Sequence, residues 1–146
     1  MEILKEVKFL AIHHSQRAED SAKFIKERHL KRGWEDIGYH HLIDKFGKVY
    51  LGRSEKYWGA HVLGQNHHSI GICIMGNFDK EEPPKKQMYS LLKLIIEKMK
   101  EYNITVENVL GHREFPNVKK TCPGYYVNMD KIRKLINKKL LKTIPN

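Results

Sequence analysis

Long apolar runs and cysteines are scarce in this sequence. None of its apolar runs approaches the roughly 20 residues that a membrane-spanning helix needs, so we expect no membrane span. Its only cysteines are Cys73 and Cys122, too few for a disulfide framework. The first residues, MEILKEVKFLAIHHS, lack the cationic start and clean apolar core of a signal peptide. The sequence therefore predicts a chain made in the cytoplasm, without disulfides.

Internal repeats, low-complexity segments and long linkers are also missing, so we expect residues 1–146 to form one domain. Positive charge, in contrast, is abundant: 27 Lys and Arg residues against 17 Asp and Glu residues give a net charge of +10. This balance favours a polyanionic partner, such as nucleic acid, a membrane surface or an anionic cell wall. The alternative is that the charges form solvated helix faces that aid solubility.

Apolar periodicity predicts strands that alternate with helices. An alternating order of this kind argues for an α/β domain with a central mixed β-sheet flanked by helices. The predicted elements are strands at 6–14, 69–78 and 106–112, a β-hairpin at 38–53 with its turn at 44–47, and helices at 17–32, 85–101 and 128–141.

Nine histidines are many for a chain of this length. Adjacent histidines on a strand point to opposite faces, so at most one of each pair should face a given site. Cys122 follows Lys119 and Lys120, and nearby lysines favour the thiolate form of a cysteine. A thiolate with imidazoles suits zinc, and three protein ligands are typical of a catalytic zinc site.

The spacing of these residues matches no compact metal motif, so two chemistries stay open. One is a zinc site. The other is a cysteine hydrolase in which Cys122 is the nucleophile and His112 the base. A chelator should inactivate only the first enzyme, and alkylation of the thiol should inactivate the second.

Five ordered motifs sharpen this choice: IHHS, DIGYHHLID, GAHVLGQNHHSIGICIMGNF, GHREF and TCPG. Together they resemble the type-2 N-acetylmuramoyl-L-alanine amidases, a family that includes phage lysozyme-like amidases and peptidoglycan-recognition proteins. The likeness runs from about Phe9 to Gly124. It implies an amidase-like fold and hydrolysis of the amide between N-acetylmuramic acid and L-alanine in bacterial peptidoglycan.

The resemblance also implies a Zn²⁺ cofactor and its ligands. The residues that match the family's ligands are His13, His112 and Cys122, with His14 a neighbour of the site. A bound zinc ion polarises a carbonyl and lowers the pKa of water toward about 7. All three matching ligands are present, which argues against a relative that has lost its metal.

Two further residues match the family's catalytic positions. Tyr39 of the GY motif is expected to hydrogen-bond the attacking water or to help transfer its proton. Lys120 is expected to stabilise the oxyanion as the carbonyl becomes tetrahedral. His61 and Asn66 match positions near the substrate groove, where a purely structural hydrogen bond is an equal alternative.

The resemblance leaves the biological setting open. A small domain without a signal peptide suits a phage-type endolysin that is made in the host cytoplasm and acts on the wall after release. A non-catalytic peptidoglycan-binding module and a cytoplasmic wall-recycling amidase are the alternatives. No nucleic-acid-binding motif supports a nucleic-acid partner, and the sequence does not decide whether a polymerase is bound, as in some phage relatives.

Overall fold

A computed structural model of the chain describes residues 1–142, and residues 143–146 at the end of the predicted domain lie outside this range. Its centre is a five-stranded sheet of strand order β3-β2-β4-β1-β5. Neighbours within β2-β4-β1-β5 are parallel, whereas β3 pairs antiparallel with β2. The strands are β1 (Phe9–His14), β2 (His41–Ile43), β3 (Val49–Leu51), β4 (Ser69–Ile74) and β5 (Val109–Gly111). The predicted mixed sheet is confirmed.

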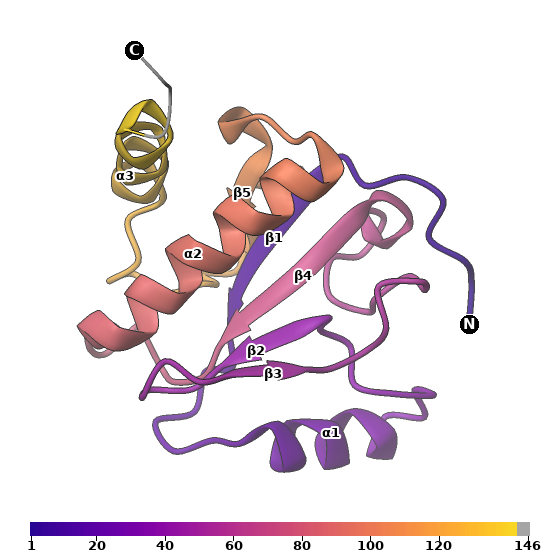
Figure 1. Cartoon of the computed structure of the whole chain (residues 1–146). Helices are drawn as coiled ribbons and strands as arrows, with labels where there is room; N and C mark the ends of the chain where they lie inside the picture. The colour runs from indigo at the N-terminus through magenta and orange to yellow at the C-terminus, as the bar shows by residue number, and fades with distance from the viewer. Residues whose placement is uncertain (143–146) are drawn as a thin grey trace.

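Helices cover both faces of this sheet (Figure 1). Helices α2 (Lys85–Tyr102) and α3 (Met129–Lys142) pack on one face, and α1 (Ala22–Lys31) lies against the other. Side chains alternate between the two faces along each strand. In β1, Leu10 and Ile12 therefore join the core beneath α2 and α3, whereas His13 points to the opposite face.

The first helix begins five residues later than the pattern predicts, at Ala22 instead of residue 17. Ser21 is the reason: its backbone is extended, and its hydroxyl accepts a hydrogen bond from the backbone N–H of Phe24 at 3.1 Å. Ser21 is thus the N-cap of α1: it is the last non-helical residue, and its side chain bonds to a backbone N–H group that has no partner within the helix. The predicted start of this helix at residue 17 is therefore wrong.

The other predicted elements lie in the expected order, but the strands are shorter than predicted. β1 begins at Phe9 instead of residue 6, β4 ends at Ile74 instead of residue 78, and residues Val106–Asn108 form a 3-10 helix before β5. The hairpin turn is closed by a hydrogen bond from the Gly47 N–H to the Asp44 carbonyl at 3.0 Å. The long helix ends one residue beyond its predicted end, at Tyr102. No helix within residues 1–142 combines the length and apolar character needed to cross a bilayer.

The parallel strands determine where the candidate site residues lie. β1 ends in His13 and His14, and its neighbour β5 leads directly into the short 3-10 helix His112–Glu114. Carboxyl ends of parallel strands meet at the same edge of a sheet, where ligands commonly bind. Two of the predicted metal ligands are therefore brought together by strand pairing alone.

A polar network joins β2 to α2 on the side of the sheet away from His13. Glu55 accepts hydrogen bonds from Lys98 Nζ at 2.8 Å and His41 Nε2 at 3.3 Å. Burial raises the pKa of Glu55, but the bonds from His41 and Lys98 outweigh it and lower the pKa to about 2. The charged carboxylate thus stabilises the folded state.

We expect Glu55→Gln to lower the free energy of unfolding by about 1–2 kcal/mol at pH 7, allowing for partial exposure. The unfolded carboxyl takes up its proton near its ordinary pKa of 4.5, before the folded one does so near 2. The wild-type advantage should therefore shrink as the pH falls through this range. Urea denaturation of both proteins at pH 7 and pH 3 measures it. A constant difference across this range contradicts the assignment.

Candidate metal centre

Three of the predicted site residues converge at the carboxyl edge of the sheet. The ligand atoms of His13, His112 and Cys122 all lie within 4.8 Å of one another, and no other such group of three or more His, Cys, Asp or Glu residues occurs in residues 1–142. The rings of His13 and His112 are 4.7 Å apart. His13 Nδ1 lies 3.7 Å from Cys122 Sγ.

This donor set fits a zinc ion. Tetrahedral zinc with bonds of about 2.0 Å to nitrogen and 2.3 Å to sulfur separates these two ligands by roughly 3.5 Å. The separation of 3.7 Å between His13 Nδ1 and Cys122 Sγ is close to that value. Three donors also leave a fourth position for water or substrate, as catalytic zinc sites do.

The remaining histidines are engaged elsewhere. His14 points to the opposite face, where its Nδ1 accepts a hydrogen bond from the Phe78 N–H at 3.1 Å. The ring of His40 bonds to the backbone of Gly71 and Tyr57. His41 contacts Glu55, His68 contacts Gln65, and the ring of His67 stacks on His68. The alternation expected for the first pair is confirmed.

Burial controls the charge states of the three donors. It lowers the pKa of His13 well below its ordinary value, with nearby histidines adding to the shift, and lowers that of His112 to about 4. Both imidazoles are therefore neutral near pH 7, as a metal requires. Burial also raises the pKa of the Cys122 thiol to about 12, outweighing the opposite effects of the His14 N–H, Lys120 and Arg113.

Lys120 lowers the pKa of the Cys122 thiol, as expected, but burial outweighs this effect, so the thiol keeps its proton in the metal-free protein. Removing a charge from water is costly, and this cost exceeds the attraction of Lys120 and Arg113. Bound zinc carries a larger charge and deprotonates a coordinating thiol outright. The environment of Cys122 thus suits a metal ligand better than a free nucleophile.

Tyr39 and Lys120 differ in their exposure to solvent. Tyr39, just before β2, packs its ring 5.1 Å from the ring of His13, and burial raises the pKa of its phenol well above the ordinary value. Lys120 is exposed, and its charge contributes to the lowered pKa values of His13 and His112. The phenol therefore remains protonated, and the ammonium faces solvent near the centre.

His61 and Asn66 reach the site through hydrogen bonds. His61 Nδ1 lies 2.9 Å from His13 Nε2. The side-chain oxygen of Asn66 accepts from the backbone N–H groups of His61 and Val62, each at 3.0 Å. Each residue thus has a structural partner, and their contact with substrate stays a prediction.

Arg113 is a residue that the sequence reasoning missed. Its Nη1 donates to the carbonyls of Thr121 at 3.0 Å and Gly124 at 2.7 Å, and its backbone N–H donates to the Cys122 carbonyl at 2.8 Å. These bonds tie the loop that carries Cys122 to Arg113, which directly follows His112 in the chain. Only the position of Arg113 within the GHREF motif hinted at this role.

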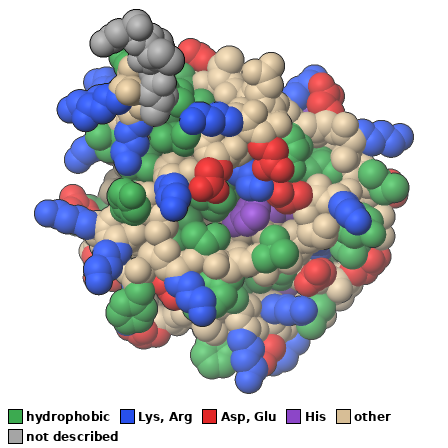
Figure 2. All heavy atoms as spheres, in the orientation of Figure 1, with side chains coloured by type: hydrophobic (Ala, Val, Ile, Leu, Met, Phe, Trp, Pro, Cys, Tyr) green, Lys and Arg blue, Asp and Glu red, His purple; other side chains and the backbone are tan. Residues whose placement is uncertain are grey.

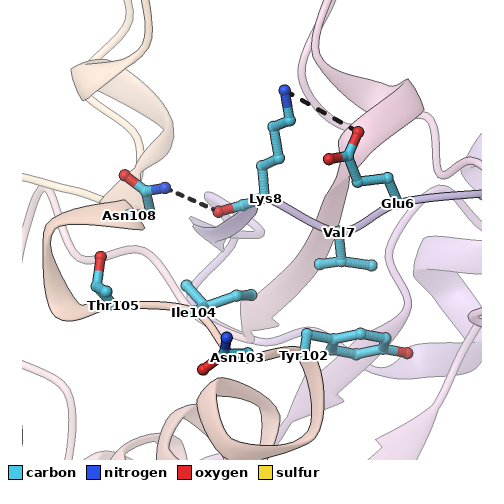
Figure 3. Close-up of a pocket in the computed structure, with 8 residues that line it drawn as sticks. All are labelled: Glu6, Val7, Lys8, Tyr102, Asn103, Ile104, Thr105 and Asn108. Carbon is cyan, nitrogen blue, oxygen red and sulfur yellow. Dashed lines mark hydrogen bonds and ion pairs between the residues drawn. The ribbon is translucent and has the colours of Figure 1, made fainter.

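Two hollows in residues 1–142 lie outside this centre. One, of about 430 Å³, lies at the opposite end of β1, where Asn108 donates to the Lys8 carbonyl and Lys8 pairs with Glu6 (Figure 3). The other, of about 300 Å³, lies between the start of α1 and the hairpin turn at Asp44. Neither hollow is lined by His13, His112 or Cys122. The candidate metal centre is therefore defined by its converging side chains and not by either hollow.

Comparison with known proteins agrees with this geometry. The N-acetylmuramoyl-L-alanine amidase family matches residues 4–125. The endolysin of Escherichia phage T7 is 36% identical over 107 residues, which cover 69% of this chain and 68% of the endolysin. Peptidoglycan-recognition protein LB of Drosophila melanogaster is 33% identical over 127 residues, covering 80% of this chain and 54% of that protein. The solved structure of the N-acetylmuramoyl-L-alanine amidase LysC from Clostridium intestinale URNW superposes with a TM-score of 0.85 at 34% identity, covering 90% of this chain and 86% of that one.

The raised pKa of Cys122 predicts slow alkylation in the metal-free protein. In a Cys73→Ala background, we expect the rate of iodoacetamide labelling to keep rising as the pH passes 9, the ordinary pKa of a thiol. Lys120→Met should slow labelling further, because the Lys120 charge lowers this pKa. A rate that levels off near neutral pH would instead favour a cysteine nucleophile. Mass spectrometry of the labelled protein gives the rate.

Proposed function

Because this chain belongs to the N-acetylmuramoyl-L-alanine amidase family, we propose that it hydrolyses the amide between N-acetylmuramic acid and L-alanine in bacterial peptidoglycan, using a zinc ion held by His13, His112 and Cys122. The observation that carries the proposal is the convergence of these three donors within 4.8 Å. When bound, zinc polarises the amide carbonyl and makes water acidic enough to attack at neutral pH.

Tyr39 orients the reacting groups in this proposal. Its phenol has a pKa raised well above 10 by burial, so it keeps its proton and does not act as a base in the ground state. A protonated phenol beside His13 is suited to hydrogen-bond the attacking water. It would also help to transfer the proton of this water as the water oxygen bonds to the carbonyl carbon. Removing the hydroxyl with Tyr39→Phe leaves the ring that packs against His13.

Lys120 supplies positive charge where negative charge develops. As water adds to the amide, the carbonyl oxygen becomes an oxyanion, and a preplaced cation stabilises this state more than the ground state. The charge of Lys120 already acts on His13 and His112. No acidic side chain within residues 1–142 forms an ion pair with Lys120, so its charge is not neutralised by a partner there.

The phage relatives favour a role as an endolysin that acts on the wall after release from the host cytoplasm. Peptidoglycan-recognition proteins among the relatives favour a second candidate, a module that binds peptidoglycan without cutting it. The complete donor set supports the enzyme. A wall-recycling amidase would share its chemistry, and the identity of the released products separates these settings.

Helix α3 offers a surface for an anionic wall. Lys131, Lys134, Lys138 and Lys142 are exposed and recur at helical spacing along one stripe. None of the four forms an ion pair with an acidic group in the described part of the chain. Figure 2 shows Lys and Arg side chains gathered over this helix. We propose that this stripe, here called the α3 lysine stripe, attracts the protein to anionic walls.

Replacing a ligand tests the zinc proposal. Cys122→Ser should lose bound zinc and wall hydrolysis together, each by about 100-fold or more, since even loss of an outer partner of a ligand costs 10–100-fold. Cys73→Ala, which removes the cysteine buried within β4, should keep both. Elemental analysis gives the zinc content, and mass analysis of digested walls gives newly freed L-alanine amino groups. Full activity in a metal-free preparation would sink the proposal.

Salt tests the wall attraction. Raising the ionic strength should weaken binding to purified walls, because screening shortens the range of charge attraction. Lys131→Gln, Lys134→Gln and Lys138→Gln combined should reduce both the binding and its salt dependence several-fold. The control is Lys23→Gln, Lys31→Gln and Lys56→Gln, which removes equal charge outside the α3 lysine stripe. Equal losses in the two triple variants argue against the stripe, and binding unchanged by salt rules out the attraction.

A further inference from the structure

A chain of hydrogen bonds leads from His13 through His61 and Ser69 to the backbone of Gln65. His13 Nε2 lies 2.9 Å from His61 Nδ1. The other ring nitrogen of His61, Nε2, lies 3.4 Å from Ser69 Oγ. Ser69 Oγ in turn donates to the carbonyl of Gln65 at 2.7 Å. The chain therefore ends on a group that can only accept.

This end point sets the direction of every bond in the chain. A serine hydroxyl has one proton, and that of Ser69 is given to Gln65. Toward His61 the same oxygen must accept, so the proton of the His61 ring is on Nε2. His61 Nδ1 then has a free lone pair and accepts from His13 Nε2–H.

The consequence for His13 is a single tautomer. With its proton on Nε2, the lone pair of this ring is on Nδ1. Nδ1 is the atom that lies 3.7 Å from Cys122 Sγ, so the lone pair points at the position where a metal would bind. The opposite tautomer would place an N–H group there and could not coordinate a metal.

The protein also fixes where the His61 ring sits. Asn66 holds the backbone N–H of His61 at 3.0 Å. Gly71 of β4 leaves room for the ring, because a Cβ atom there would lie 2.6 Å from His61 Cγ. A Cβ on Gly59 would meet the same ring at 2.5 Å. The ring therefore occupies a space that two glycines keep open.

We propose that His61 and Ser69 form a relay that fixes the tautomer and orientation of His13, which makes His61 a positioning residue of the metal centre. This inference rests on the proposed zinc site. A ligating histidine whose second nitrogen is held by an acceptor is oriented and is a stronger base toward the metal. His61 thus acts through His13, in a role different from the substrate contact that its motif predicts.

Two variants separate the hydrogen bond from simple filling of space. His61→Asn can place its side-chain oxygen near the position of Nδ1 and still accept from His13, whereas His61→Leu cannot accept. We expect His61→Leu to weaken zinc binding about 10–100-fold and His61→Asn to recover most of that loss. Competition with a chelator of known affinity measures it in the full-length chain. Equal affinities in wild type and His61→Leu, or no recovery in His61→Asn, would overturn the relay.

A spectroscopic readout on the wild type avoids any folding defect of the variants. Nitrogen-15 NMR of the imidazoles, with zinc and after chelation, should show the proton of His13 on Nε2 in both forms. A proton on Nδ1 after chelation would refute the relay whatever the zinc affinity. Failure of the wild type to bind zinc would instead refute the proposed function, because the tautomer of the metal-free ring is measured independently.

A third variant tests the space itself. Gly71→Ala leaves His61 chemically intact but pushes its ring away from β4, so we expect the His13 tautomer to become mixed and zinc affinity to fall. Urea denaturation confirms that the variant is folded. A folded Gly71→Ala protein with an unchanged His13 tautomer and zinc affinity would show that the position of the His61 ring does not control them.

Discussion

The parallel pairing of β1 with β4 and β5 is the constraint on which the rest of this structure depends. β1 is paired on both sides, and alternation along it sends Leu10 and Ile12 into the core beneath α2 and α3. The same alternation turns His13 to the other face. Because β5 runs parallel beside it, His112 follows at the same edge of the sheet. One register thus fixes both the burial of the apolar side chains and the meeting of His13 with His112, and a slip of one residue would send each side chain to the opposite face of the sheet.

Burial then decides the chemistry of the donors. The same lack of solvent that lowers the pKa of His13 raises the pKa of Cys122, because it disfavours the charged form of each group. Neutral imidazoles are ready for a metal, whereas the thiol gives up its proton only as a metal binds. Binding of the proposed zinc ion would therefore be coupled to release of the thiol proton, which the charge of Lys120 does not achieve by itself.

The sequence predicts the parts of this molecule that are set by local pattern. The apolar run of β4 and the stripe of α2 are visible in their periods, and the ordered motifs indicate His13, His112 and Cys122 through family resemblance. What it misses depends on residues far apart in the chain. Arg113 bonds to the loop of Cys122 only once that loop has folded back. The thiol pKa follows from burial, which composition does not show, and the start of α1 followed from a single capping residue, Ser21.

The two sides of the candidate metal centre carry different groups. On one side, His61 lies against His13, and the chain of hydrogen bonds through Ser69 ends on the Gln65 carbonyl, so both ring nitrogens of His61 have a partner. On the other side, His112 and Cys122 are partly exposed and Lys120 is exposed. In the proposed reaction, an amide that approaches from the side of Lys120 would place its developing oxyanion near a cation.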